Sequence, residues 1–96
     1  MQRDSALQLL AQSKPVLAQR FGVRDLALFG STSQNLAGAQ SDVDVLVGFD
    51  GPATSARFFG VQFYLEDALG RRVDLVTDKA LRPELRPFVE AQAIHV

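Results

Sequence analysis

Two aspartates, Asp42 and Asp44, lie inside an apolar stretch that reads SDVDVLVGF. Side chains two residues apart on a strand share a face, so both carboxylates are expected to point the same way, with Val43 and Val45 on the other side. A charge that loses its water costs several kcal/mol unless something pairs with it. The two aspartates therefore either point into solvent or face a cation.

A third carboxylate, Asp74, stands in the later apolar run RRVDLVT. If this run forms a strand beside the one that holds Asp42 and Asp44, the three carboxylates meet on one face and raise one another's pKa until cations neutralise them. Magnesium suits such a site because it is a hard cation with oxygen ligands, held by one or two carboxylates plus substrate phosphates. Two such ions can activate an attacking oxygen and stabilise a leaving pyrophosphate.

The dipeptide Gly30-Ser31 ends the apolar run DLALF, with ten residues between it and Asp42. Glycine permits a sharp turn or a close neighbour, and Ser31 can cap a short helix that follows. A helix N-terminus offers free N–H groups and the positive end of its dipole to a phosphate. A phosphate cradle near metal-binding carboxylates is what phosphoryl or nucleotidyl transfer needs, since that chemistry is mostly positioning and charge neutralisation.

Each of these features also has an interpretation without chemistry. Gly30-Ser31 is compatible with an ordinary turn, and Asp42 with a turn at the entry to its strand. Asp74 could lie on the exposed face of an edge strand, paired with an adjacent arginine. The single histidine, His95, is expected at the surface or at a sheet edge. The aromatic residues of 54–70 are expected to lie in the core or in a subunit interface and not to stack on bases; they are Phe58, Phe59, Phe63 and Tyr64.

Hydrophobic spacing and turn signals indicate the elements that must position these residues. Residues 4–12 are predicted to form one helix. A second helix is predicted over 13–20, started by a capping serine and Pro15 and stopped by Gly22, because the residue before a proline resists the helical conformation. One kinked helix through Pro15 is the alternative.

Strands and helices are expected to alternate through the rest of the chain. The predicted strands are 25–30, 43–49 and 71–77. The other expected elements are a helix over 54–70, a turn at 80–86, a helix near 87–92 and a short strand at 93–96. This alternation predicts an α/β (α+β) fold in which a small mixed sheet has helices packed on one face.

Composition narrows the class of protein. The 96 residues predict a single domain, 1–96, with 47% hydrophobic residues and a net charge of −1. The charges form no block of one sign, so direct nucleic-acid binding is not expected. The absence of cysteine excludes disulfides and zinc–thiolate sites and is compatible with a cytoplasmic location. No apolar run approaches the roughly 18 residues of a membrane span, and no signal peptide is expected.

The conjunction of Gly30-Ser31, the Asp-x-Asp pair and the later Asp74 resembles the signature of the DNA-polymerase-β-like nucleotidyltransferase superfamily. The chain resembles the minimal nucleotidyltransferase (MNT) branch of this superfamily in its length and in three segments, RFGVRDLALFGS, SDVDVLV and RRVDLVTDKALRPELRPFVEAQAIHV. The resemblance implies that Gly30 and Ser31 hold a nucleoside triphosphate and that Asp42 and Asp44 bind Mg²⁺, as two ions with the nucleotide. It implies that Asp74 is a third carboxylate, which assists the metals and could be the general base for an acceptor hydroxyl.

Members of this branch are commonly encoded as antitoxins beside a HEPN-domain ribonuclease toxin. The resemblance therefore implies a HEPN toxin as partner and transfer of AMP from ATP to one of its tyrosine hydroxyls. Neutralisation by binding alone is the alternative, and a small-molecule or RNA acceptor is a third interpretation. The apolar content of so small a chain also makes a homo-oligomer an expectation.

The loop after Gly30-Ser31 departs from the pattern of many family members, which carry an arginine there. No Lys or Arg occurs between residues 31 and 56. A cation that would help to hold a triphosphate is therefore missing from its usual place. The basic residues that could replace it are Arg57, Arg71, Arg72 and Lys79.

Overall fold

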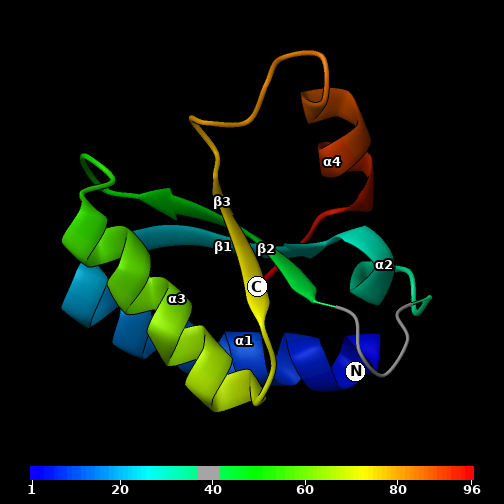
Figure 1. Ribbon diagram of the computed structural model, residues 1–96, viewed down its shortest axis with the longest axis horizontal. Helices are drawn as coiled ribbons and strands as arrows, with labels where there is room; N and C mark the ends of the chain where they lie inside the picture. Colours follow the sequence, from blue (N-terminus) through cyan, green and yellow to red (C-terminus); the bar gives the residue numbers. More distant parts are fainter. Residues whose placement is uncertain (37–41) are drawn as a thin grey trace.

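The computed structural model describes residues 1–36 and 42–96, and these residues form one four-stranded sheet with helices on it (Figure 1). The elements in chain order are α1 (Arg3–Phe21), β1 (Val23–Phe29), α2 (Gly30–Ser33), β2 (Val43–Phe49), α3 (Ser55–Leu69), β3 (Val73–Thr77), α4 (Arg86–Gln92) and β4 (Ile94–His95). The sheet order is β3-β2-β1-β4, with β2 and β3 parallel and β1 antiparallel to β2 and β4. The predicted mixed sheet and its strands are confirmed. None of the described helices is long and apolar enough to cross a membrane.

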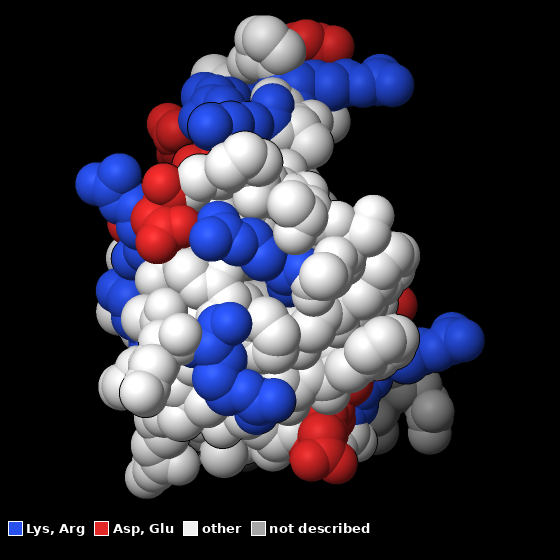
Figure 2. Space-filling view, turned by 90° about the vertical axis from the view of Figure 1, so that its left-hand side faces the viewer, with Lys and Arg blue, Asp and Glu red and all other residues white. Residues whose placement is uncertain are grey.

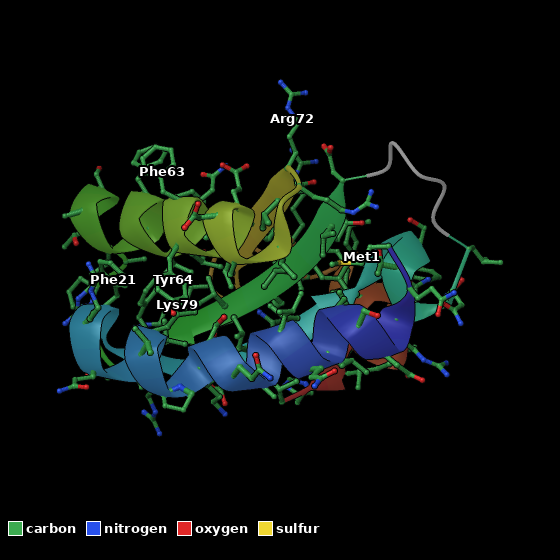
Figure 3. The ribbon with its side chains drawn as sticks, turned by 90° about the horizontal axis from the view of Figure 1, so that it is seen from below. Met1, Phe21, Phe63, Tyr64, Arg72 and Lys79 are labelled. Carbon is green, nitrogen blue, oxygen red and sulfur yellow. The ribbon has the colours of Figure 1, made fainter. Side chains whose placement is uncertain are left out.

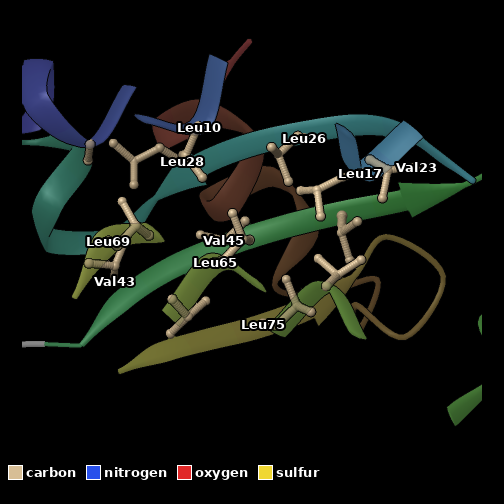
Figure 4. Packing of buried hydrophobic residues seen from close by; sticks show 14 residues of the cluster. Leu10, Leu17, Val23, Leu26, Leu28, Val43, Val45, Leu65, Leu69 and Leu75 are labelled. Atoms are coloured by element: carbon tan, nitrogen blue, oxygen red, sulfur yellow. The ribbon is translucent and has the colours of Figure 1, made fainter. Parts of the chain in front are cut away.

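Helices α1 and α3 lie side by side and cover one face of the sheet (Figures 1 and 3). The main core fills the layer between these helices and the strands (Figure 4). Val43, Val45 and Val47 of β2 are fully buried in it. Each such side chain contributes roughly 1.5–3 kcal/mol when it leaves water, so the three valines fix which face of β2 meets the helices.

The opposite face of the sheet carries a smaller apolar cluster. Alternation along β2 turns Asp44 and Leu46 to this face. Leu46 packs there with Ala27 of β1 and Leu81, and Val89 of α4 rests against them. Helix α4 therefore covers part of this second face and leaves the start of β2 open.

A single helix, α1, replaces the two helices predicted over 4–12 and 13–20, so that prediction is wrong. The buried side chains of α1 are Ala6, Leu10, Ser13 and Leu17. They form one stripe at helical spacing that continues past Pro15. The burial of this stripe outweighs the about 3 kcal/mol that a proline costs inside a helix. The Ser13 hydroxyl donates a hydrogen bond to the Leu9 carbonyl at 2.8 Å instead of capping a new helix.

The aromatic residues of α3 divide between the core and the surface. Phe58 and Tyr64 pack against the main core. Phe59 and Phe63 are 49% and 64% exposed, and their rings stack with centroids 6.2 Å apart. His95 is exposed on β4, the edge strand beside β1, as the sequence predicted.

The predicted helix over 54–70 is confirmed by α3, which the Thr54 side chain caps by accepting a first-turn N–H at 3.2 Å. Gly60 lies in the middle of this helix. A Cβ at position 60 would lie 2.7 Å from Cζ of Phe21, at the end of α1. Gly60 therefore lets the Phe21 ring pack directly on the α3 backbone.

Gly60→Ala is expected to lower the free energy of unfolding by about 1 kcal/mol, although alanine is the better helix former by about that amount. The added methyl group displaces the Phe21 ring, and the lost packing exceeds the gain in propensity. Urea unfolding followed by circular dichroism measures the change. Ala68→Gly, at an exposed position of α3, is the control for propensity alone. A Gly60→Ala variant more stable than the native chain would contradict this packing.

Candidate active site

Asp44 stands near the start of β2, in register with Phe29 of β1 on one side and Asp74 of β3 on the other. Neighbouring strands lie about 4.8 Å apart, so the Asp44 and Asp74 side chains are adjacent on the face opposite α1 and α3. The structure thus brings together two of the three aspartates that the sequence singles out.

Gly30 begins α2 at the point where β1 ends. Its φ of 73° lies in the left-handed region. A Cβ at position 30 would lie 2.9 Å from Cγ of Asp44 and closer still to Oδ2. Only glycine satisfies both the backbone conformation and this close approach. Gly30 therefore seats the Asp44 carboxyl group against the first residue of α2.

The surroundings of Asp44 favour its neutral form. The pKa of Asp44 is raised from 3.8 to about 6, first by burial and then by the charge of Asp74, the hydrogen bond with Asp74 and the charge of Asp42. A bound cation would reverse this balance, because an opposite charge stabilises the ionised carboxylates.

Asp42 is exposed and directly follows residues 37–41. These residues, which include the second half of the loop after Gly30-Ser31, lie outside the described residues. Its charge still acts on Asp44. Within residues 1–36 and 42–96, no three Asp, Glu, His or Cys side chains converge as a ready metal site. The described arrangement is a close pair of carboxylates with a third nearby.

Helix α2 places hydroxyl groups next to Asp44. Ser31 is half-buried, and the Ser33 hydroxyl donates to the Gly30 carbonyl at 2.7 Å. Thr32 is 1% exposed, and no partner for its hydroxyl is found among the described residues, although buried polar groups are normally paired. Of these three hydroxyl residues, Ser31 is the one open enough to meet a bound anion.

Two of the four basic candidates lie far from the carboxylates. Arg57 pairs with Asp50 at 2.9 Å, beyond the far end of β2 and about 20 Å along the strand from Asp44. Lys79 follows the far end of β3, well away from Arg72 (Figure 3). Figure 2 shows the side of the molecule away from α2. The Lys and Arg side chains on this side are scattered over the surface.

Arg71 and Arg72 border a surface pocket of about 720 Å³ between α3 and the start of β3, here called the α3–β3 pocket. Its lining residues are Asp42, Gln62, Glu66, Gly70, Arg71, Arg72, Val73 and Asp74. The pocket thus adjoins the carboxylate pair through Asp74. Sequence reasoning missed it because the side chains of α3 that form its wall carry no motif.

The residues present fit a magnesium ion. Carboxylate oxygens are the hard ligands that Mg²⁺ prefers, and it is commonly held by one or two carboxylates together with substrate phosphates. Asp44 and Asp74 supply such a pair, with Asp42 beside them. Gly30, at the start of α2, lies directly against the Asp44 carboxyl group.

This chain is similar to known proteins in sequence and in fold. A family model described as a nucleotidyltransferase domain matches residues 10–95. The protein adenylyltransferase MntA of Thermococcus cleftensis is 38% identical over 88 residues, 92% of this chain and 89% of that protein. A solved structure assigned as a minimal nucleotidyltransferase is 33% identical with a TM-score of 0.82, over 98% of this chain and 95% of that one.

The fold alone is shared with a more distant structure. A chain of the complex between the tri-AMPylated HEPN toxin of Shewanella oneidensis and an MNT antitoxin has a TM-score of 0.60 at 22% identity. The match covers 97% of this chain and 66% of that one.

Asp44→Asn is expected to stabilise the metal-free protein at pH 7.5. Because the raised pKa makes the folded state bind more protons than the unfolded state between about pH 4 and pH 6, stability falls as the pH rises through this window. Solvent screens the partly exposed carboxylate, so the gain should be only about 1 kcal/mol, or roughly 4–8 °C in melting temperature.

Thermal melts in EDTA at pH 4 and pH 7.5 measure this gain. It should be absent at pH 4, where Asp44 is protonated in the native chain. Glu84→Gln, on an exposed loop, removes the same charge elsewhere and should change little. An Asp44→Asn variant that melts lower than the native chain at pH 7.5 would show that no repulsion is relieved.

Proposed function

The chain belongs to the nucleotidyltransferase domain family, and from this we propose that it is a Mg²⁺-dependent protein adenylyltransferase that acts as an antitoxin. In this proposal it transfers AMP from ATP to a tyrosine hydroxyl of a HEPN-family ribonuclease toxin. The observation that carries the proposal is the Asp44–Asp74 pair seated against Gly30. Two adjacent carboxylates destabilise the empty site, and a bound cation relieves their repulsion.

The proposed reaction is a displacement at the α-phosphorus of ATP. The acceptor hydroxyl oxygen forms a bond to this phosphorus, and the bond from phosphorus to the oxygen that bridges to the β-phosphate breaks. The electron pair of that bond leaves with pyrophosphate. Asp74 is exposed and adjacent to Asp44, so it can accept the hydroxyl proton and pass it to solvent.

The other site residues position the nucleotide in this proposal. Gly30 and Ser31 would hold the triphosphate at the start of α2, and Asp42, Asp44 and Asp74 would hold Mg²⁺, as two ions once the nucleotide is bound. The bound metal supplies charge neutralisation at the reacting phosphate and the leaving pyrophosphate. The carboxylates in turn orient the phosphate toward the acceptor.

The relatives support the antitoxin assignment. One of them is named as a protein adenylyltransferase at 38% identity. The Shewanella oneidensis complex, which shares the fold, contains a HEPN toxin that carries AMP groups. A cytoplasmic location and a HEPN partner would follow if this chain works in the same way.

A second candidate function is neutralisation of the toxin by binding alone. The observation that favours it is the absence of Lys and Arg between residues 31 and 56, which weakens the case for tight triphosphate binding. The two candidates differ in what happens when Asp44 is neutralised.

Asp44→Asn is expected to lower AMP transfer roughly a hundredfold or more, because the metal loses a ligand at the reacting phosphate. Purified chain, ATP and Mg²⁺ are incubated with the proposed cognate HEPN toxin, and intact mass counts the AMP groups added. Glu84→Gln should transfer AMP like the native chain.

Growth of cells that express the HEPN protein separates the two candidates. If transfer is the function, Asp44→Asn should fail to protect the cells while Glu84→Gln protects them. Full protection by Asp44→Asn, with no AMP on the toxin, would instead establish binding alone.

A further inference from the structure

Gly30, Asp44 and Asp74 lie in a row across the sheet, from the end of β1 through β2 to β3. In an in-line displacement, the attacking oxygen and the leaving group occupy opposite sides of the phosphorus. If the triphosphate lies against Gly30, the attacking hydroxyl comes from the β3 side. The α3–β3 pocket opens on that side, since Asp74 is part of its lining.

The wall of the α3–β3 pocket is held in place by hydrogen bonds. Glu66 Oε2 accepts the Val73 N–H at 3.0 Å, and Gln62 Nε2 donates to the Val73 carbonyl at 3.4 Å. These backbone groups face away from β2 and would otherwise offer an open sheet edge. Side chains of α3 therefore cover the edge at the start of β3 and give the pocket a fixed shape.

Arg72 extends from the rim of this pocket. Its carbonyl accepts the Val43 N–H at 3.0 Å, which fixes its backbone to β2. Its side chain is exposed and points away from the body of the protein (Figure 3), and no ion pair to it occurs within residues 1–36 and 42–96. Once Asp42 and Asp74 serve a metal, neither carboxylate remains available to neutralise this guanidinium.

We propose that the α3–β3 pocket receives the acceptor, and that Arg72 binds an anionic group of the acceptor next to the reacting hydroxyl. The proposal rests on the proposed function. A guanidinium binds carboxylate and phosphate oxygens through two parallel hydrogen bonds, which fixes orientation as well as position. The hydroxyl oxygen then lies beside Asp74, forms the bond to the α-phosphorus, and pyrophosphate leaves toward Gly30.

The anionic group has two chemical sources. It is either a carboxylate on the toxin segment that carries the hydroxyl, or the phosphodiester of an AMP group already attached to that segment. In the first case Arg72 acts on the first transfer, and in the second case it acts only on later transfers. Either source makes Arg72 a residue for acceptor recognition and leaves the nucleotide to Gly30 and the carboxylates.

The test compares the native chain with Arg72→Gln, Arg72→Lys and the control Arg82→Gln, which removes an exposed arginine from the loop before α4. Four quantities are measured. Two are dissociation constants: the Kd for a non-hydrolysable ATP analogue in the presence of Mg²⁺, and the Kd for the HEPN protein. The other two are KM and kcat for each AMP added, followed by intact mass. Thermal melts check that every variant is folded.

Arg72→Gln is expected to raise the KM for the HEPN protein roughly tenfold, the loss of one charge-assisted contact, while kcat and the nucleotide Kd stay near native. If the anionic group is a carboxylate, the Kd for the unmodified HEPN protein rises by the same factor. The KM of Arg72→Lys should lie between those of the native chain and Arg72→Gln, and the KM of Arg82→Gln should match that of the native chain. If KM rises already at the first addition, the anionic group is a carboxylate. If KM rises at the later additions and not at the first, the anionic group is an attached phosphodiester.

Weaker nucleotide binding with an unchanged acceptor KM would overturn the proposal and make Arg72 a triphosphate ligand. Unchanged values for both ligands would overturn it as well. If the native chain transfers no AMP, the proposed function fails. The Kd values for the HEPN protein would still decide whether Arg72 recognises a carboxylate on it.

Discussion

The contact between the Asp44 carboxyl group and the Gly30 backbone is the constraint on which the site depends. Gly30 leaves β1 in the left-handed conformation and lacks a Cβ, so the carboxyl group can lie against the start of α2. On its other side Asp44 meets Asp74 across a parallel strand pair. Burial and repulsion favour a proton on Asp44, and this unfavourable arrangement becomes favourable when a cation is present.

The rest of the fold serves to hold that contact. The valines of β2 face α1 and α3, which forces Asp44, between Val43 and Val45, onto the other face of the sheet. The crossover through α3 returns the chain parallel to β2 and places Asp74 level with Asp44. Stability gained in the core thus offsets the cost of two adjacent carboxylates, a common division between scaffold and functional site.

Much of this could be predicted from the sequence because it follows from local periodicity. The alternation around Asp44 predicted both its strand and its face, and the strand of Asp74 was found in the same way. For α1 the local signals favoured two helices and left one helix through Pro15 as the alternative. The single helix forms because a buried stripe on the sheet, a tertiary effect, outweighs the local resistance of the residue before proline. The α3–β3 pocket was missed because Gln62 and Glu66 reach it only after α3 docks on the edge of β3.

The central claim is that Asp44 and Asp74 act as one unit that binds Mg²⁺ with a nucleotide. Isothermal titration of Mg²⁺ into the protein with a non-hydrolysable ATP analogue tests it most directly, on the native chain, Asp44→Asn, Asp74→Asn and the double variant. We predict that each single variant loses most of the affinity and that the double variant loses little more, because one ligand of a shared ion cannot hold it alone. Native affinity in Asp44→Asn, or losses that simply add in the double variant, would contradict the account.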